Sequence, residues 1–370
     1  MMNQSGAKYF MIGGFLGAGK TTCVGRFAQW LTDRKLRVGL ITNDQGNQLV
    51  DTAYLRAKGF PTQEISGGCF CCRFDSLTEA AASLTNESRP EAFVAEPVGS
   101  CTDLVATVSY PLRRIYGDQY TIAPLSVVVD PRRARRVMGL EEGRGFSEKV
   151  NYIYRKQLEE ADIIVINKTD LLREEEVEAL TEALGKAFPH ATLLNVSART
   201  GDGLEGWFER MLGAEGGRRE AMAVDYEVYA EGEALLGWLN ATLRLSSEDG
   251  FDANEVLKTL TDRIQRNLAQ AESETAHLKM TFEPSRGLGE LAVINVVGGE
   301  FVSELSQRVD ERYGDGTLIV NLRAEGEPEV LKAALLEAVS ELSGLNASVE
   351  HLEHFKPGKP EPTHRETTSV

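Results

Sequence analysis

The order of apolar runs along the first 200 residues predicts alternating strands and helices. Short β-branched runs recur, and stretches with the 3.6-residue period of an amphipathic helix separate most of them. The predicted strands cover residues 9–12, 37–42, 91–95, 125–129, 162–166 and 191–196. Strands that alternate with helices form βαβ units, in which helices cover a parallel sheet. The first part of the chain is therefore expected to be an α/β domain with a mostly parallel sheet.

The pattern changes after a Gly-rich stretch at 213–219, which we interpret as a linker. The elements predicted beyond it are strands at 233–246, 277–282, 290–297, 317–323 and 347–352, and helices at 253–271 and 327–342. Without the segment 286–312, this order is β-α-β-β-α-β, which indicates a smaller ferredoxin-like α+β domain with an inserted hairpin. We expect domains at 1–215 and 225–355, followed by an extended or disordered tail, rich in Pro and polar residues, at 356–370.

Composition narrows the class of partner. The 370 residues are 42% hydrophobic and 26% charged, as in an ordinary globular protein, and the net charge is −16. A chain this acidic is a poor candidate for nucleic-acid binding, which needs a surplus of Lys and Arg. The basic run at 132–136 is expected to be a solvated helix face.

The cysteines indicate a reducing compartment. The chain has five, and three of them lie within four residues, which does not fit a disulfide framework. The apolar N-terminus is interrupted by glycines and a lysine, and no stretch is long enough to span a bilayer. We therefore expect a cytoplasmic protein without a membrane partner.

A phosphate-binding loop follows the first predicted strand. Residues 14–21 read GFLGAGKT, which fits the pattern G-x-x-x-x-G-K-[ST] and opens a predicted helix. Glycines let backbone N–H groups converge on phosphate, and the helix N-terminus adds partial positive charge. Lys20 would reach the β- and γ-phosphates, and the Thr21 hydroxyl would ligate Mg²⁺. The residues expected to bind the phosphates are Gly14, Gly17, Ala18, Gly19, Lys20, Thr21 and Thr22.

Two further loops favour guanine over adenine. The sequence NKTD follows the strand at 162–166, and the Asp170 carboxylate would accept hydrogen bonds from guanine N1–H and the 2-amino group. Adenine lacks this pair of donors, so a site built in this way rejects ATP. Asn167 and Lys168 would brace the loops. Ser197 and Ala198 follow the next strand in a sequence that resembles the fifth GTPase motif, where the Ala198 N–H would meet guanine O6.

Acidic residues after two other strands are candidates for metal contact and catalysis. Glu96 ends one strand, and the Gly99 N–H would contact the γ-phosphate. Asp44 follows the strand at 37–42, and Asp51 lies beyond it. Glu96 and Asp44 are expected to hold Mg²⁺ with Thr21 or to orient the attacking water, so the predicted catalytic residues are Lys20, Asp44 and Glu96.

A second site is predicted at a cysteine cluster. Cys69, Cys71 and Cys72 follow two glycines in the sequence GGCFCC. Thiolates bind Zn²⁺ and other borderline or soft ions, and three within four residues can converge on one ion. The alternative is that they are three packed structural residues.

As a set, GGFLGAGKTT, GGCFCC, E-x-x-G and NKTDL resemble the CobW-like GTPases of the SIMIBI class, over about residues 8 to 210. The resemblance implies a GTP-dependent metallochaperone or cofactor-loading protein that forms a homodimer. It also implies that the cysteine cluster binds a transition metal, with Zn²⁺ as the first candidate and Co²⁺ or Ni²⁺ as alternatives. Two motifs depart from the family pattern: NDQG at 43–46, and Cys101 in the sequence EPVGSC.

The function predicted from these features is GTP hydrolysis to GDP with Mg²⁺, coupled to delivery of a transition metal to a client metallo- or cofactor-dependent protein. Two alternatives stay open. One is a GTPase that loads or guards a corrinoid-type cofactor in a client enzyme. The other is a nucleotide-switched binding module whose cysteines are structural.

Overall fold

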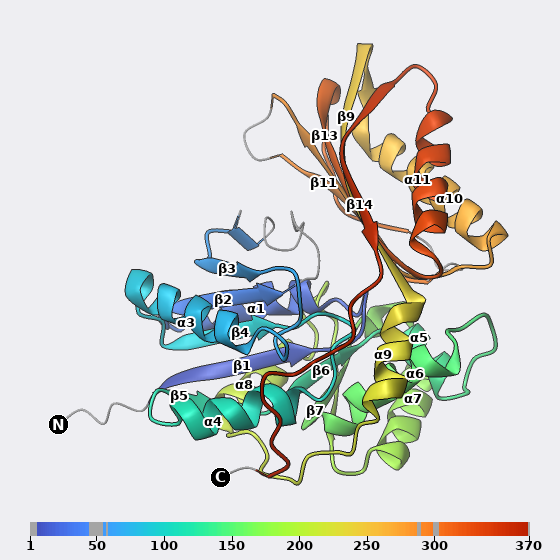
Figure 1. Cartoon of the computed structure of the whole chain (residues 1–370). Coiled ribbons are helices and arrows are strands. Elements are labelled where there is room, and N and C mark those ends of the chain that lie inside the picture. The colour runs from blue at the N-terminus through green and yellow to red at the C-terminus, as the bar shows by residue number, and fades with distance from the viewer. Residues whose placement is uncertain (1–5, 44–54, 57, 287–289, 299–302, 369–370) are drawn as a thin grey trace. The chain divides into compact units, whose positions relative to one another are not determined.

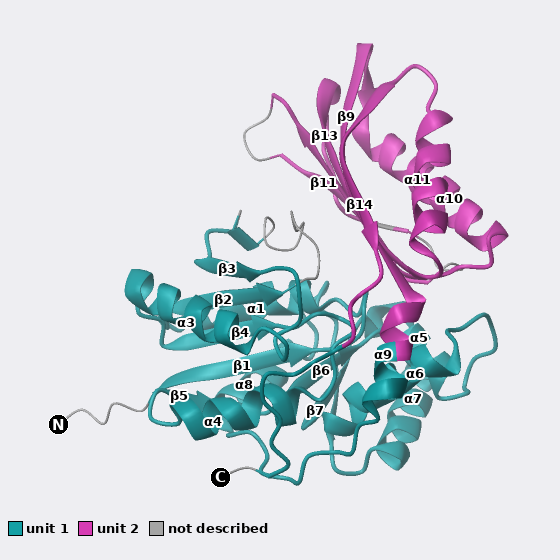
Figure 2. Cartoon of the chain, viewed as in Figure 1, with its two compact units in different colours: residues 1–230, 360–370 teal, residues 231–359 magenta. Residues whose placement is uncertain are grey.

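The computed structural model describes residues 6–43, 55–56, 58–286, 290–298 and 303–368. The chain divides into two compact units, shown in different colours in Figure 2. Unit 1 contains residues 1–230 together with 360–370, and unit 2 contains residues 231–359. The C-terminal segment therefore belongs to unit 1, although unit 2 precedes it in the chain.

Unit 1 is built on a parallel sheet, as expected from the alternating pattern (Figure 1). Its order is β3-β2-β4-β1-β6-β7-β8, and β5 also pairs with β1. The strands are β1 (Ala7–Gly13), β2 (Val38–Asn43), β3 (Thr62–Ile65), β4 (Ala92–Glu96), β5 (Tyr120–Ile122), β6 (Ser126–Val129), β7 (Ile163–Ile166) and β8 (Thr192–Asn195). Because the pairs are parallel, the carboxyl ends of the strands meet at one edge of the sheet, where open α/β folds bind ligands.

The helices of unit 1 connect these strands. They are α1 (Lys20–Asp33), α3 (Phe74–Ser88), the π-helix η1 (Val105–Ser109), α4 (Tyr110–Tyr116), α5 (Pro131–Val137), α6 (Glu148–Glu160), the short η2 (Thr169–Leu171), α7 (Glu174–Ala187) and α8 (Leu204–Gly213). Successive side chains of a strand point to opposite faces of the sheet. Phe10 and Ile12 of β1 share one buried core with Phe27 of α1 and Trp207 of α8. This core fixes α1, and with it the phosphate-binding loop, against the sheet.

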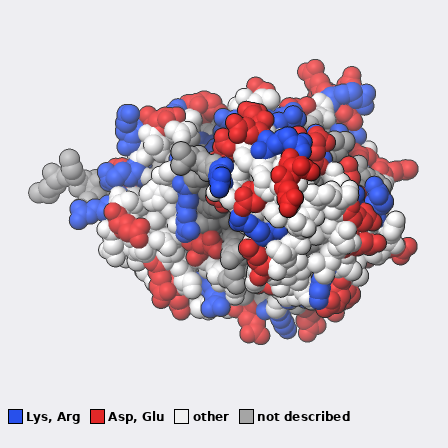
Figure 3. All heavy atoms as spheres, turned by 90° about the horizontal axis from the view of Figure 1, so that it is seen from above, with Lys and Arg blue, Asp and Glu red and all other residues white. Residues whose placement is uncertain are grey.

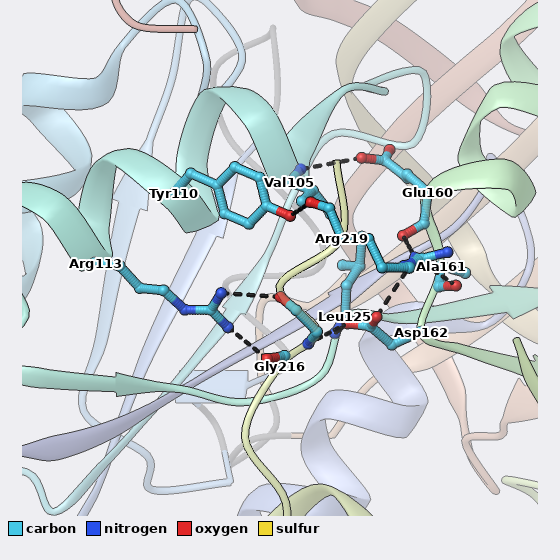
Figure 4. Close-up of polar contacts among 10 residues, drawn as sticks. Val105, Tyr110, Arg113, Leu125, Glu160, Ala161, Asp162, Gly216 and Arg219 are labelled. Atoms are coloured by element: carbon cyan, nitrogen blue, oxygen red, sulfur yellow. Dashed lines mark hydrogen bonds and ion pairs between the residues drawn. The ribbon is translucent and has the colours of Figure 1, made fainter. Parts of the chain in front are cut away.

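The segment after α8, interpreted from the sequence as a linker, is held against unit 1 (Figure 4). Arg113 donates to the carbonyls of Gly216 and Gly217 at 2.8 and 2.9 Å. Arg219 lies in the segment itself and donates to the carbonyls of Glu160 and Ala161 at the end of α6. Hydrogen bonds from both arginines therefore hold the segment against unit 1. The division between the units falls farther on, within α9 (Tyr226–Leu235).

Unit 2 is the α+β domain expected from the sequence, with an antiparallel sheet in the order β12-β11-β10-β13-β9-β14. Its elements are β9 (Leu236–Asp252), α10 (Ala253–Gln270), β10 (Glu274–Pro284), β11 (Ala292–Val296), β12 (Glu304–Gln307), β13 (Arg312–Glu325), α11 (Pro328–Ser340) and β14 (Asn346–Phe355). The strands β10, β13, β9 and β14 form the ferredoxin-like sheet, and β11 and β12 are the inserted hairpin that extends it beyond β10.

Both helices of unit 2 share one core with its sheet, as the amphipathic patterns require. Leu257 and Ile264 of α10 and Leu335 of α11 are buried with Leu243 of β9 and Val320 of β13. Asp252 caps α10, since its carboxylate accepts hydrogen bonds from the N–H groups of Asn254 and Glu255.

Candidate nucleotide site and cysteine cluster

The loop between β1 and α1 has the backbone that phosphate binding requires. Gly14, Gly17 and Gly19 have φ values of +132°, +78° and +94°, a region that favours glycine. A Cβ on Gly14 would lie 2.1 Å from the carbonyl oxygen of Val128 on β6, so this position also needs glycine for close approach. The loop ends at the N-terminus of α1, where free N–H groups and the helix dipole favour an anion.

Lys20, Thr21 and Glu96 come together at the start of α1. Lys20 is buried, and the Thr21 hydroxyl donates to Glu96 Oε1 at 3.0 Å. Glu96 is the last residue of β4 and is also buried, so the contact joins the phosphate loop to the loop that follows β4. A hydroxyl beside a carboxylate is the donor set that holds Mg²⁺ in phosphate-loop proteins, so these residues fit the ion that the motif predicts.

The remaining predicted phosphate residues lie around this point. Thr22 is exposed on the first turn of α1, and Ala18 is buried in the loop. Gly99 lies against the loop, because a Cβ at this position would be 3.0 Å from the backbone nitrogen of Leu16. Asp44 and Asp51 lie outside the described residues, so their predicted roles stay predictions.

The two guanine-reading loops brace the phosphate loop directly. Asn167 donates to the carbonyl of Ala18 at 2.9 Å and accepts from the N–H of Ala198 at 2.9 Å. Lys168 donates to the carbonyl of Gly17 at 2.9 Å. The Asn167 side chain, which follows β7, therefore connects the loop after β1 to the loop after β8.

Asp170 and Ser197 also meet, because the Ser197 hydroxyl donates to Asp170 Oδ1 at 2.6 Å, and Arg199 pairs with Asp170 Oδ2. Each carboxylate oxygen has a second acceptor site, so the carboxylate keeps the capacity to accept from guanine. The structure thus brings together the predicted residues of both guanine motifs.

Two buried charges under the phosphate loop were not predicted. Asp130 caps α5 and pairs with Lys168 at 2.9 Å. Burial alone would raise the pKa of Asp130, but the charges of Lys168 and Arg133 outweigh it and hold this pKa below the usual value. Arg133 is buried and donates to the carbonyl of Leu16 in the loop, so the expectation of a solvated helix face is wrong at this position. Its neighbours Arg135 and Arg136 instead pair with acidic residues near the surface.

The three clustered cysteines converge in a turn between β3 and α3. Gly67 and Gly68 have positive φ values of 72° and 155°, which lets the chain reverse in front of the turn. The Cys69 sulfur lies 2.8 Å from that of Cys71 and 3.3 Å from that of Cys72, and the third pair is 3.6 Å apart. Sulfurs around a tetrahedral Zn²⁺ lie about 3.8 Å apart, so a small outward movement of these thiols would suit one ion.

The acidities of these thiols are coupled. Hydrogen bonds from the thiols of Cys101, Cys71 and Cys72 lower the pKa of Cys69 well below its usual value. The same contacts to Cys69, together with burial, raise the pKa of Cys71 and bring that of Cys72 to about 11. These contacts favour the thiolate form at Cys69, and thiolates are the form that binds metal.

Contacts from two strand ends reach the cysteine turn. Asn43, the last residue of β2, donates to the carbonyls of Ile65 and Gly68 at 3.0 and 2.7 Å. Cys101 lies in the loop that begins at Glu96, and its thiol hydrogen-bonds to that of Cys69. The turn is therefore connected to the strand that precedes Asp44 and to the loop that follows Glu96.

The C-terminal segment also contacts this turn, which the sequence did not predict. Residues 360–368 form neither helix nor strand and lie in unit 1. The N–H of Thr363 donates to the carbonyl of Cys71 at 2.9 Å, and the N–H of Glu361 donates to the Cys72 sulfur at 3.2 Å.

The fold and these loops define a P-loop nucleotide-binding protein. The family model described as CobW/HypB/UreG, nucleotide-binding domain, matches residues 8–195, just over half of the chain. The chain therefore belongs to the CobW/HypB/UreG family, which confirms the resemblance drawn from its motifs.

Named relatives agree with this assignment. The zinc chaperone CobW of Sinorhizobium sp is 30% identical over 192 residues, which cover 46% of this chain and 53% of that protein. The zinc chaperone YeiR of Escherichia coli (strain K12) is 29% identical over 173 residues, which cover 46% of this chain and 49% of that protein. The chain thus spans about half the length of these curated relatives. The crystal structure of hydrogenase maturation factor HypB from Archaeoglobus fulgidus matches with a TM-score of 0.40 at 22% identity, covering 57% of this chain and 92% of that one.

On the face seen in Figure 3, acidic and basic side chains are interspersed. Within the described ranges, no helix combines the length and apolar character needed to cross a bilayer.

Proposed function

We propose that this protein binds and hydrolyses GTP with Mg²⁺, and that it carries a transition metal on Cys69, Cys71 and Cys72. Metal delivery to a client protein would depend on the bound nucleotide. One observation carries the proposal: the turn that brings three sulfurs within 3.6 Å of one another is hydrogen-bonded to Asn43 at the end of β2 and to Cys101 in the loop after Glu96.

Base selection would depend on Asp170. Its carboxylate is held at the sheet edge by Ser197, beside the Ala198 N–H that Asn167 fixes. A carboxylate that accepts from N1–H and the 2-amino group recognises guanine and leaves an unsatisfied charge with adenine. This arrangement supports GTP over ATP as the substrate.

Hydrolysis would depend on charge placed around the phosphates. Lys20 lies at the N-terminus of α1, where it would contact the β- and γ-phosphate oxygens. Thr21 and Glu96 would hold Mg²⁺, together with Asp44, and Gly99 would offer its N–H to the γ-phosphate. When bound, Mg²⁺ would neutralise the negative charge that develops on the transferred phosphoryl group.

The cargo would be an ion that prefers thiolates, and Zn²⁺ fits this preference best, with Co²⁺ and Ni²⁺ as alternatives. The names of two relatives, both zinc chaperones, support this choice. We further propose that unit 2 recognises the client and that the protein forms a homodimer.

An anaerobic titration with Co²⁺ tests the proposal, because thiolate ligation to Co²⁺ produces charge-transfer absorption. The titration is made with GTP–Mg²⁺ and with GDP, on the native protein, on Cys71→Ser, and on Cys23→Ala as a control at a buried thiol of α1. We expect a thiolate signal that Cys71→Ser loses and Cys23→Ala keeps, and an affinity that differs between nucleotides by about 5- to 100-fold. No thiolate signal in either nucleotide state would exclude metal transport, and equal affinities would exclude the coupling.

A further inference from the structure

The C-terminal segment 360–368 lies across the cysteine turn. Besides the two backbone N–H contacts to Cys71 and Cys72, the Thr363 hydroxyl donates to the Cys72 carbonyl at 3.4 Å. The ring of His364 packs edge-on against Phe74, the first residue of α3, with centroids 4.9 Å apart. The segment therefore contacts both the backbone and a sulfur of the proposed metal site.

A second group of contacts holds the same segment to the loop after β4. Arg365 Nε donates to Asp103 Oδ2 at 2.7 Å, and Asp103 has only 1% of its side chain exposed. The neighbouring Glu366 N–H donates to the carbonyl of Ala106 at 2.9 Å, and its carboxylate pairs with Arg114 at 2.6 Å. Because Asp103 follows Cys101 in the loop that starts at Glu96, this anchor is on the segment expected to sense the γ-phosphate.

The three thiols differ in exposure with the segment in place. Cys69 and Cys71 are 4% and 1% exposed, whereas Cys72 is partly exposed and is the cysteine whose sulfur accepts the Glu361 N–H. Cys72 is thus the member of the cluster that an external ligand or client thiol would reach first once the segment moves away.

We propose that residues 360–368 form a lid on the cysteine cluster, anchored by the Arg365–Asp103 ion pair, and that the lid must detach before metal enters or leaves. The part about metal rests on the proposed function, whereas the covering of the thiols does not. The lid is held by a few hydrogen bonds and ion pairs at its two ends, so it opens without unfolding of the sheet. Movement of the loop after Glu96 on nucleotide binding would shift the anchor at Asp103 and hence the position of the lid.

Alkylation of the metal-free protein with iodoacetamide tests the lid independently of metal. Labelling of Cys72 is followed by mass spectrometry in the native protein, in Arg365→Ala, and in a chain that ends at Lys359. Arg155→Ala is the matched control, because Arg155 is exposed on α6 and donates to the carbonyl of Val137 rather than to the lid. We expect labelling to accelerate about tenfold in Arg365→Ala, at least as much in the shortened chain, and not in the control. Labelling at the native rate in both lid variants would overturn the proposal.

A second pair of variants tests the contact to the sulfur itself. Glu361→Pro removes the N–H that reaches Cys72, and Glu361→Ala keeps it. Faster labelling in Glu361→Pro alone supports the lid, and equal rates in the two variants contradict this contact. Transfer of Zn²⁺ from loaded protein to a chelator is then measured in Arg365→Ala, where about tenfold faster release is expected. Faster labelling in a protein that binds no Zn²⁺ would leave the lid standing and refute the metal function, and native release rates from a loaded site would refute the role of the lid in metal exchange.

Discussion

The two halves of the carboxyl edge of the unit 1 sheet are held together differently. In the guanine half, after β1, β7 and β8, Asn167 connects the backbones of Ala18 and Ala198 from one side chain. In the cysteine half, after β2, β3 and β4, the joining contacts are separate: Asn43 to Gly68 and, through the lid, Arg365 to Asp103. The first half is braced as a unit, and the second is a series of contacts that can break one at a time.

This difference indicates a division of labour. A braced site is preorganised, so its recognition of the base costs little rearrangement on binding. A site joined by separable contacts can take two arrangements, and two arrangements are what coupling between a nucleotide and a metal requires. Mutations in the guanine half should therefore change affinity for the base, and mutations in the cysteine half should change how the metal site responds to nucleotide.

The largest effect is expected in the guanine half, from Asp170→Asn. Asparagine offers one acceptor and one donor where guanine needs two acceptors, so GTP affinity should fall by about a thousandfold. Xanthosine triphosphate, which presents an oxygen in place of the 2-amino group, should bind the variant more tightly than GTP. Fluorescent nucleotide titration measures both affinities.

Asp118→Asn, at an exposed acid before β5, is the control for that experiment and should bind GTP like the native protein. A variant Asp170→Asn that keeps native GTP affinity would show that Asp170 does not read the base. The contacts that brace the guanine half would then not serve recognition of the base.

The next effect concerns the contact between the halves at Thr21 and Glu96. Glu96→Gln keeps an acceptor for the Thr21 hydroxyl but removes the negative charge, so Mg²⁺-dependent GTP hydrolysis should slow by about a hundredfold. Nucleotide affinity measured without Mg²⁺ should stay unchanged. Phosphate release under single-turnover conditions provides the measurement, and a native rate would remove Glu96 from the catalytic set.

Much of this site could be predicted from the sequence, because its parts are local motifs at strand ends. GKT and NKTD each follow a predicted strand, and a parallel sheet brings the ends of those strands to one edge. GGCFCC was found by its composition alone, because β3, the strand that precedes it, was not predicted. The β-α-β-β-α-β order of unit 2 could also be predicted, since its strands and helices have clear periods. The predicted start of its first strand was wrong, because residues 233–235 belong to α9 and β9 begins at Leu236. The predicted role of Asp44 stays a prediction, because this residue lies outside the described residues.

Other features depend on tertiary contacts that leave no local signal. Arg133 stands in a run of arginines, and nothing in that run shows which one turns inward to the carbonyl of Leu16. The contact between Glu361 and Cys72 joins residues 289 positions apart, from a segment whose composition is typical of an unstructured tail. Such contacts are determined by the shape of the folded unit and not by any periodic pattern.

A pH effect on stability is expected at Glu160, the last residue of α6. This carboxyl accepts from the Thr102 hydroxyl and from the Val105 N–H, the second of which is drawn in Figure 4. Burial, reinforced by Asp103, raises the pKa of Glu160 from 4.5 to about 8. Between these values the folded protein holds a proton that the unfolded chain releases, so the stability contributed here decreases as the pH rises from about 5 to 8.

Glu160→Gln cannot ionise, so the variant should lose up to about 2 kcal/mol of this pH dependence. Urea unfolding at pH 6 and pH 8, followed by tryptophan fluorescence, measures the change in the free energy of unfolding. The exposed acid Glu148, changed to Gln, serves as the control on the same helix. A variant Glu160→Gln with the same pH dependence as the native protein would show that Glu160 has an ordinary pKa.

The smallest effect is also the sharpest test of the comparison, and it concerns Asn43. Asn43→Ala removes both hydrogen bonds between the end of β2 and the segment before Cys69, but it leaves the three thiols in place. Metal should therefore still bind, while the ratio of Co²⁺ affinities with GTP and with GDP should fall by about fivefold, towards one. This ratio is insensitive to a general loss of stability, because both affinities are measured on the same variant. Gln63→Ala, on β3 but directed to Ser83 and Glu87, should keep the native ratio. If Asn43→Ala also keeps it, the coupling does not pass through β2, and the loop from Glu96 to Cys101 is left as its route.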